Sequence, residues 1–260
     1  MRRVIGLCGF LLFAIQIGQA QNPVTGVKGN HVAAEFQFPR FDGDNEIGNY
    51  TLFLSGSFRL SPKLTLRADI PISSSGFVNF DNTEQALGNP YIGIGIKSND
   101  RTSLNFGIRL PLAQDDEFAL FTGLLTDQRR TEAFIPDAFT LNAGIRHIYK
   151  APTNLLQIDA GASGDLIFIQ EDDGEFFVDY HAMVWLVPPK VKVGAGITGT
   201  TFVTGDGDFS ENTTNFLNIS AKLRGVFQPG LFIRVPIDDQ VSEIFDYSIG
   251  INFSLALGLL

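Results

Sequence analysis

Residues 50–60 read YTLFLSGSFRL, and their apolar and polar side chains alternate. Alternation with a period of two predicts a β-strand, because successive side chains of a strand point to opposite faces. One face is apolar and the other is polar, apart from one aromatic residue, Phe53. The apolar face carries Leu52, Leu54, Phe58 and Leu60, and the polar face carries Thr51, Ser55, Ser57 and Arg59.

The same period recurs along the chain and predicts twelve strands. Each is close to the ~9–11 residues that a tilted strand needs to cross a membrane. The predicted strands are 30–39, 50–60, 63–72, 90–98, 101–113, 137–149, 154–168, 176–187, 190–203, 214–227, 230–237 and 244–257.

The connections between these strands are alternately short and long. Short turns on the periplasmic side and long extracellular loops are typical of outer-membrane barrels. We therefore predict an all-β protein, a transmembrane antiparallel up-and-down β-barrel of about twelve strands, within a range of ten to fourteen. The long connections are 40–49, 73–89, 114–136, 169–175, 204–213 and 238–243.

The polar faces of the predicted strands carry many charges. A soluble sandwich or lipocalin-like fold would bury one strand face in a dry core, where this many cations would be very costly. A wet lumen accommodates them, and they either pair across a narrow barrel or form a series of sites for a passing solute. The candidate lumen-facing residues are Arg59, Arg67, Asp69, Arg109, Arg146, Asp159, Asp179, His181, Lys222, Arg224 and Arg234.

The first twenty residues have the pattern of a secretory signal peptide. Arg2 and Arg3 precede an apolar run, residues 4–17, and Gly18-Gln19-Ala20 matches the small-x-small cleavage pattern. A membrane anchor is the alternative, although the apolar run is short for a span. We predict a signal peptide at 1–20, a barrel domain at 21–260 and a location in the cell outer membrane of a Gram-negative bacterium. The single cysteine, Cys8, belongs to the signal peptide.

The long connections are rich in acidic residues. An acidic extracellular rim would concentrate cations at the mouth of the barrel, or it would only keep the loops solvated. The net charge of −9 also argues against a nucleic-acid partner. The predicted rim comprises Asp115, Asp116, Glu117, Glu171, Asp172, Asp173, Asp206 and Asp208.

The connection 114–136 has apolar residues at helical spacing: Phe118, Phe121, Leu124 and Leu125. We expect a helix here that folds over or into the lumen as a constriction. Two further strands or an interface are the alternatives. Residues 21–30 are a second candidate plug.

The sequence lacks the patterns of a barrel enzyme or a metal site. There is no Gly-x-Ser-x-Gly nucleophile motif, and Asp179 and His181 share a strand face without an identifiable nucleophile. The calcium-loop-like run 206–210 has Leu217 where a glutamate would be needed. We therefore expect no catalytic residue, no metal and no cofactor. Gly93-x-Gly95 and Gly194-x-Gly196 are expected to be lumen-facing or close-packing glycines within strands.

The run LGNPYIGIGIK at residues 87–97, followed by a strand ending in Leu110-Pro111, resembles one family of outer-membrane proteins. This is the meta-pathway phenol-degradation-like β-barrel family. The preceding strand end, residues 69–71, resembles it too, whereas Asn89 stands where the family often has aspartate. The resemblance implies a transporter of hydrophobic or aromatic compounds, distantly like the long-chain fatty-acid transporters.

The predicted function is a passive channel or transporter for small molecules, and only the resemblance implies that these are hydrophobic or aromatic. A structural or surface-interaction barrel with a sealed lumen is the main alternative, and a lipid-modifying enzyme is a third. The expected partners are outer-membrane lipid, the barrel-insertion machinery and a small-molecule solute that the sequence does not identify.

Overall fold

The computed structural model describes residues 30–41, 49–76, 83–113, 118–127, 129–169, 174–205, 209, 211–243 and 245–257. The predicted signal peptide lies outside these ranges. All eight residues of the predicted acidic rim and the candidate plug 21–29 also lie outside them.

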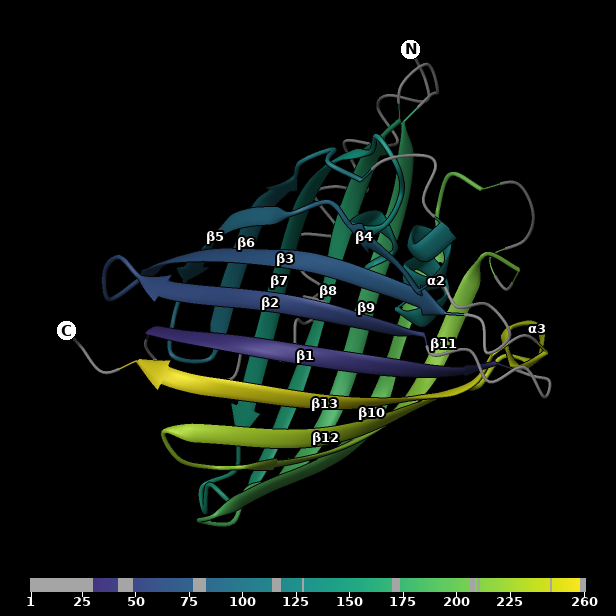
Figure 1. Ribbon diagram of the computed structural model, residues 1–260. Coiled ribbons are helices and arrows are strands. Elements are labelled where there is room, and N and C mark those ends of the chain that lie inside the picture. Colours follow the sequence, from purple (N-terminus) through teal and green to yellow (C-terminus); the bar gives the residue numbers. More distant parts are fainter. Residues whose placement is uncertain are drawn as a thin grey trace.

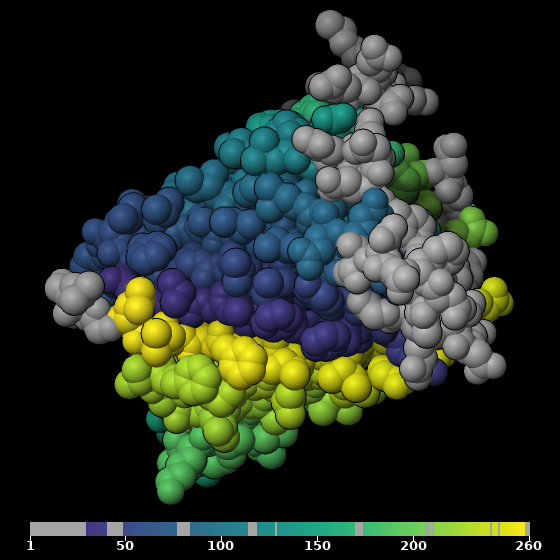
Figure 2. Space-filling view, in the orientation of Figure 1, coloured from purple at the N-terminus to yellow at the C-terminus, as the bar shows by residue number. Residues whose placement is uncertain are grey.

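The strands form one closed antiparallel barrel of twelve positions, which confirms the predicted fold class (Figure 1). The first strand closes the ring on the last, with Asn30 opposite Leu257 and Phe38 opposite Ile249. Figure 2 shows these two strands side by side, purple against yellow. The barrel strands are β1 (Asn30–Phe41), β2 (Tyr50–Arg59), β3 (Leu64–Gly76), β5 (Tyr91–Lys97), β6 (Thr102–Arg109), β7 (Phe139–Lys150), β8 (Leu156–Phe168), β9 (Glu175–Leu186), β10 (Val191–Phe202), β11 (Thr213–Leu223), β12 (Phe227–Pro236) and β13 (Phe245–Leu257).

One predicted connection, 73–89, is wrong in part, because β3 continues to Gly76 and a further short strand, β4 (Thr83–Leu87), follows. Both β4 and β5 pair with β3, which pairs with β2 at its other edge. They are therefore two pieces of one barrel strand, separated by Gly88-Asn89-Pro90. Pro90 has no N–H to give to a ladder, which favours a break at this point.

The strand predicted at 101–113 also ends early, at Arg109. The Oδ1 atom of Asn89 accepts hydrogen bonds from the backbone N–H groups of Leu112 and Ala113, both at 2.9 Å. Pro111 between Leu110 and Leu112 cannot donate to a strand ladder. Asn89, at the break between β4 and β5, thus binds the chain that follows β6 and ends that strand at Arg109.

The outer face of the barrel is apolar. Many large side chains there are well exposed, including Ile94, Val184, Leu217 and Ile249 at 38%, 50%, 41% and 43%. A soluble monomer rarely exposes a continuous apolar surface of this size, whereas lipid favours it. In the described parts of the chain, no helix is long and apolar enough to cross a membrane.

Candidate functional site

The chain between β6 and β7 enters the lumen. We call its described residues, 113, 118–127 and 129–137, the luminal segment; they include α2 (Phe118–Thr126) and η2 (Thr131–Ala133). α2 packs on β1–β4, and the ring of Phe134 meets Phe53 of β2 edge-on, with centroids 5.7 Å apart. The aromatic residue on the polar face of β2 is thus explained by its contact with this segment.

The expectation of a constricting helix agrees with this arrangement, and two further strands are not formed by the described residues of the segment. The predicted apolar helix face is wrong in part: Leu124 packs against the buried cluster, but Phe121 does not belong to the covered side. Phe121 is 53% exposed, whereas Ala119 and Leu120 are buried. Helical spacing identified the helix, but in a helix this short the surrounding barrel decides which side is covered.

Asp127, directly after α2, is one fastening point of the luminal segment. It is fully buried and accepts hydrogen bonds from Gln37 of β1 at 2.8 Å, from Arg130 at 2.6 Å and from Arg234 of β12 at 2.9 Å. Burial alone would raise the pKa of Asp127, but the adjacent guanidinium groups of Arg130 and Arg234 hold it well below its usual range. The carboxylate is therefore ionised in the folded protein. Arg130 also forms an ion pair with Glu35 of β1.

Glu132, in η2, is the second fastening point. It accepts a hydrogen bond from Arg109 of β6 at 2.8 Å, and the same guanidinium donates to Asp69 of β3 at 2.9 Å. Burial raises the pKa of Glu132, and Arg109 only partly opposes this effect because it is shared between two carboxylates. The two fastening points therefore differ: the pKa of Asp127 is lowered, whereas the pKa of Glu132 is raised.

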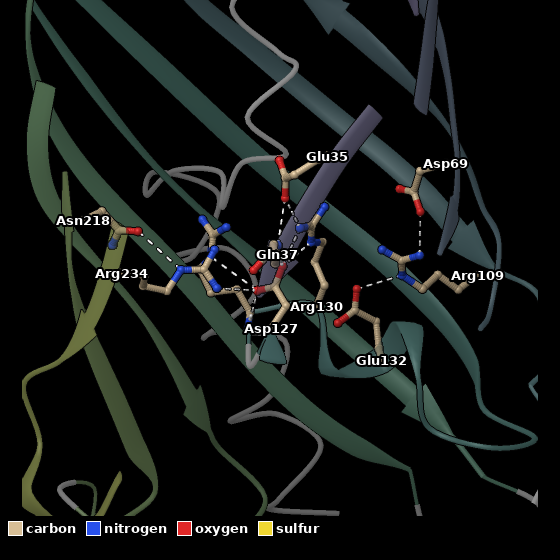
Figure 3. Close-up of polar contacts among 10 residues, drawn as sticks. Glu35, Gln37, Asp69, Arg109, Asp127, Arg130, Glu132, Asn218 and Arg234 are labelled. Carbon is tan, nitrogen blue, oxygen red and sulfur yellow. Dashed lines mark hydrogen bonds and ion pairs between the residues drawn. The ribbon is translucent and has the colours of Figure 1, made fainter. Parts of the chain in front are cut away.

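These two contacts lie on opposite walls of the barrel. β12, which carries Arg234, and β6, which carries Arg109, stand six positions apart in the ring of twelve. Figure 3 shows Arg234 and Asn218 on one side of the segment and Asp69 and Arg109 on the other. Arg234 and Arg109 thus reach the luminal segment from opposite sides of the lumen.

Two cavities lie between the luminal segment and the short turns of the barrel. One has a volume of about 920 Å³ and the other about 550 Å³. Every candidate lumen-facing residue lines at least one of them. The larger cavity contains Arg146, Asp159, His181, Lys222, Arg224 and Arg234, and the smaller contains Arg59, Arg67, Asp69, Arg109, Arg146 and Asp179.

The structure pairs His181 with Asp159 of β8, and not with Asp179, which shares its strand face on β9. His181 Nε2 lies 3.4 Å from Asp159 Oδ1, and the same carboxylate accepts a 2.7 Å hydrogen bond from Arg146. Asp179 instead accepts a hydrogen bond from Thr200. Asp179 and His181 are therefore not joined as the catalytic half-triad considered from the sequence. The described residues contain no group of three potential ligands that could hold a metal ion.

Sequence reasoning missed the partners in the luminal segment, since strand parity has no meaning in a helical connection. It also missed Lys192 and Trp185, which line the larger cavity. The polar face of β10 could not be recognised from alternation, because the positions that follow Lys192 on the same face are Gly194 and Gly196, which have no side chain. These glycines lie within a strand, as predicted, and leave room for Trp185 and Met183 on β9.

Comparisons with known proteins point to the fold alone. No protein-family model and no curated protein sequence matches the chain. Among solved structures, the COG4313 outer-membrane channel from Pseudomonas putida F1 superposes with a TM-score of 0.61 at 11% identity, covering 92% of this chain and 100% of that one. The chain has the fold of a bacterial outer-membrane β-barrel.

Two other similar structures illustrate how widely this fold is used. LpxR from Salmonella typhimurium has a TM-score of 0.55 at 10% identity, over 87% of this chain and 100% of that one. A mutant of the TodX monoaromatic hydrocarbon channel has a TM-score of 0.52 at 9% identity, over 94% and 98%. At these identities the likeness carries no residue roles to this chain.

Proposed function

We propose that the protein is an outer-membrane channel or transporter for small molecules, with the luminal segment as its gate. The observation that supports this is the way the segment is held. Side chains at two walls and a few hydrogen bonds from Asn89 fasten it, whereas the barrel closes through continuous backbone ladders that do not include the segment. The segment can therefore move without opening the ring of strands.

The cavities supply space for a solute on the side of the short turns. Their lining mixes charged side chains with apolar ones such as Met183 and Phe232. We propose small hydrophobic or aromatic compounds as the cargo, in agreement with the family that the run 87–97 resembles. The proposal includes no catalytic step, and we expect His181→Ala to leave lipid composition unchanged in every lipid-modification assay.

A sealed structural barrel is the second candidate, and the buried ion pairs of Asp127 and Glu132 favour it. In that case the segment would be a permanent part of the core. The two candidates differ in whether solute ever passes.

The test is the conductance of the refolded protein in a planar lipid bilayer, after a heat-dependent gel shift has shown that the barrel is folded. Discrete current steps would support the channel. A folded protein that stays silent over the whole voltage range, and that remains silent when Asp127→Asn loosens the segment, would establish the sealed barrel instead.

A further inference from the structure

The larger cavity has a strong imbalance of charge. Among the residues that the structure describes, seven cationic side chains line it, against a single carboxylate, Asp159. Cations in a partly dehydrated space are unfavourable unless an anion or a hydrogen-bond acceptor compensates them. The lining therefore calls for negative charge from another source.

Most of these cations are compensated within the protein. Arg146 pairs with Asp159, Arg234 pairs with Asp127 of the luminal segment, and Arg224 donates to the carbonyl of Pro188. Arg129 also lies beside Asp127, at 3.7 Å, and Lys150 is exposed at the turn.

Two lysines are left over. Lys192 of β10 and Lys222 of β11 have no carboxylate partner among the residues that the structure describes. They stand directly opposite each other on adjacent strands, an arrangement in which like charges repel. An anion placed between the two ammonium groups would turn this repulsion into attraction.

An aromatic wall lies beside the lysine pair. Lys192 Nζ is 4.1 Å from the centroid of the Trp185 ring. The indole lies across Gly194, where any side chain would collide with it. Trp185 Nε1 is a buried donor with no acceptor in the described part of the chain, and His181 Nδ1 also lacks a partner there.

We propose that Lys192, Lys222 and Trp185 form a binding site for a small organic anion with an aromatic or apolar body, such as an aromatic carboxylate. The carboxylate lies between the two ammonium groups, as charge-assisted hydrogen bonding favours, and the body lies along Trp185 and Met183. A cavity of about 920 Å³ is of the size that small-molecule sites have. The inference rests on the proposed channel function and names the chemical class of its solute.

Trp185 is the only tryptophan of the chain, so its fluorescence reports on this site alone. The refolded protein would be titrated with 4-nitrobenzoate, whose nitroaromatic ring quenches indole on contact, and with the uncharged 4-nitrobenzamide. We expect saturable quenching by the anion and at least tenfold weaker quenching by the amide, the equivalent of one lost charge-assisted contact of about 1.4 kcal/mol. Equal affinity for the two compounds would overturn the proposed anion site.

Lys222→Met is the main variant, because the cation that lies over the indole is Lys192, which this variant keeps in place beside the fluorophore. Lys192→Met is the second variant, and Lys190→Met is the matched control, since Lys190 is exposed at the turn and its replacement changes the net charge equally. Each site variant should bind 4-nitrobenzoate about tenfold more weakly than the wild type, whereas the control should bind it with wild-type affinity. Unchanged affinity in both site variants, with folding verified by gel shift, would refute the proposal.

Bilayer current separates this inference from the channel proposal. Charge-selective quenching in a barrel without current would support the anion site and refute the channel. Current without charge-selective quenching would support the channel and refute the anion site.

Discussion

Replacing Asp127 with asparagine tests whether charge holds the luminal segment in place. The side chain is fully buried and accepts hydrogen bonds from the side chains of Gln37, Arg130 and Arg234 and from the backbone N–H of Arg129. Asparagine keeps the shape and one acceptor oxygen but removes the negative charge that faces the guanidinium groups. Of the acidic groups that contact them, Glu35 remains, through its pair with Arg130.

Removing one partner of a buried ion pair destabilises a protein by about 3–5 kcal/mol. Because asparagine retains an acceptor, we expect about 3 kcal/mol, which corresponds to a rise of about two orders of magnitude in the undocked population of the segment. The barrel wall is unaffected, since its backbone ladders do not include Asp127.

Single-channel recording would show the larger undocked population as a higher open probability. The heat-dependent gel shift checks that the barrel stays folded. Glu132→Gln is the matched control, because it is also an isosteric amide replacement of a buried carboxylate in the same segment. Its expected effect is small or favours docking, since burial raises the pKa of Glu132 and the neutral side chain resembles its protonated form. An open probability in Asp127→Asn equal to that of the wild type would refute the reasoning that the charge of Asp127 holds the luminal segment in place.

Three further outcomes are expected. Because the pKa of docked Glu132 is raised, docking should tighten as the pH falls through that pKa and weaken as it rises; openings should become rarer on acidification in the wild type, and this pH dependence should vanish in Glu132→Gln. Asn89→Ala leaves two backbone N–H donors unbonded, which should cost about 2–3 kcal/mol and appear as faster proteolysis of the segment without loss of the gel shift. Gly88→Ala would place a methyl group against the carbonyl of Ala133, so it should displace η2 and raise conductance, and a wild-type current trace would contradict that contact.

The barrel was predictable from the sequence because its signal is repeated in every strand. Alternation such as that of residues 50–60 locates each strand and assigns its faces, and the short turns place the strand ends within a few residues. The break at Asn89 was not predictable, since it depends on hydrogen bonds to chain more than twenty residues away. Likewise, the contact of Asp127 with Arg234, 107 residues apart, leaves no local pattern.

The aromatic position on the polar face of β2 is an instructive intermediate case. Phe53 interrupts the polar face in a way that strand period alone does not explain. In the folded protein its ring receives Phe134 edge-on and lies 3.3 Å beneath the guanidinium of Arg130. An apolar residue facing a wet lumen is therefore a usable sequence signal for a segment that fills it.

The type of cation divides the luminal charges into two groups. Arg109, Arg146 and Arg234 each donate to a carboxylate on another element, and a guanidinium with its fixed fork of donors suits such permanent pairing. Lys192 and Lys222 face the larger cavity, and an ammonium group on a flexible stem suits a partner that arrives and leaves. Rigid pairing across the lumen and a series of solute sites were alternatives when only the sequence was considered. The geometry assigns rigid pairing to these three arginines, and we propose exchangeable binding for the two lysines, so that one lumen serves both purposes.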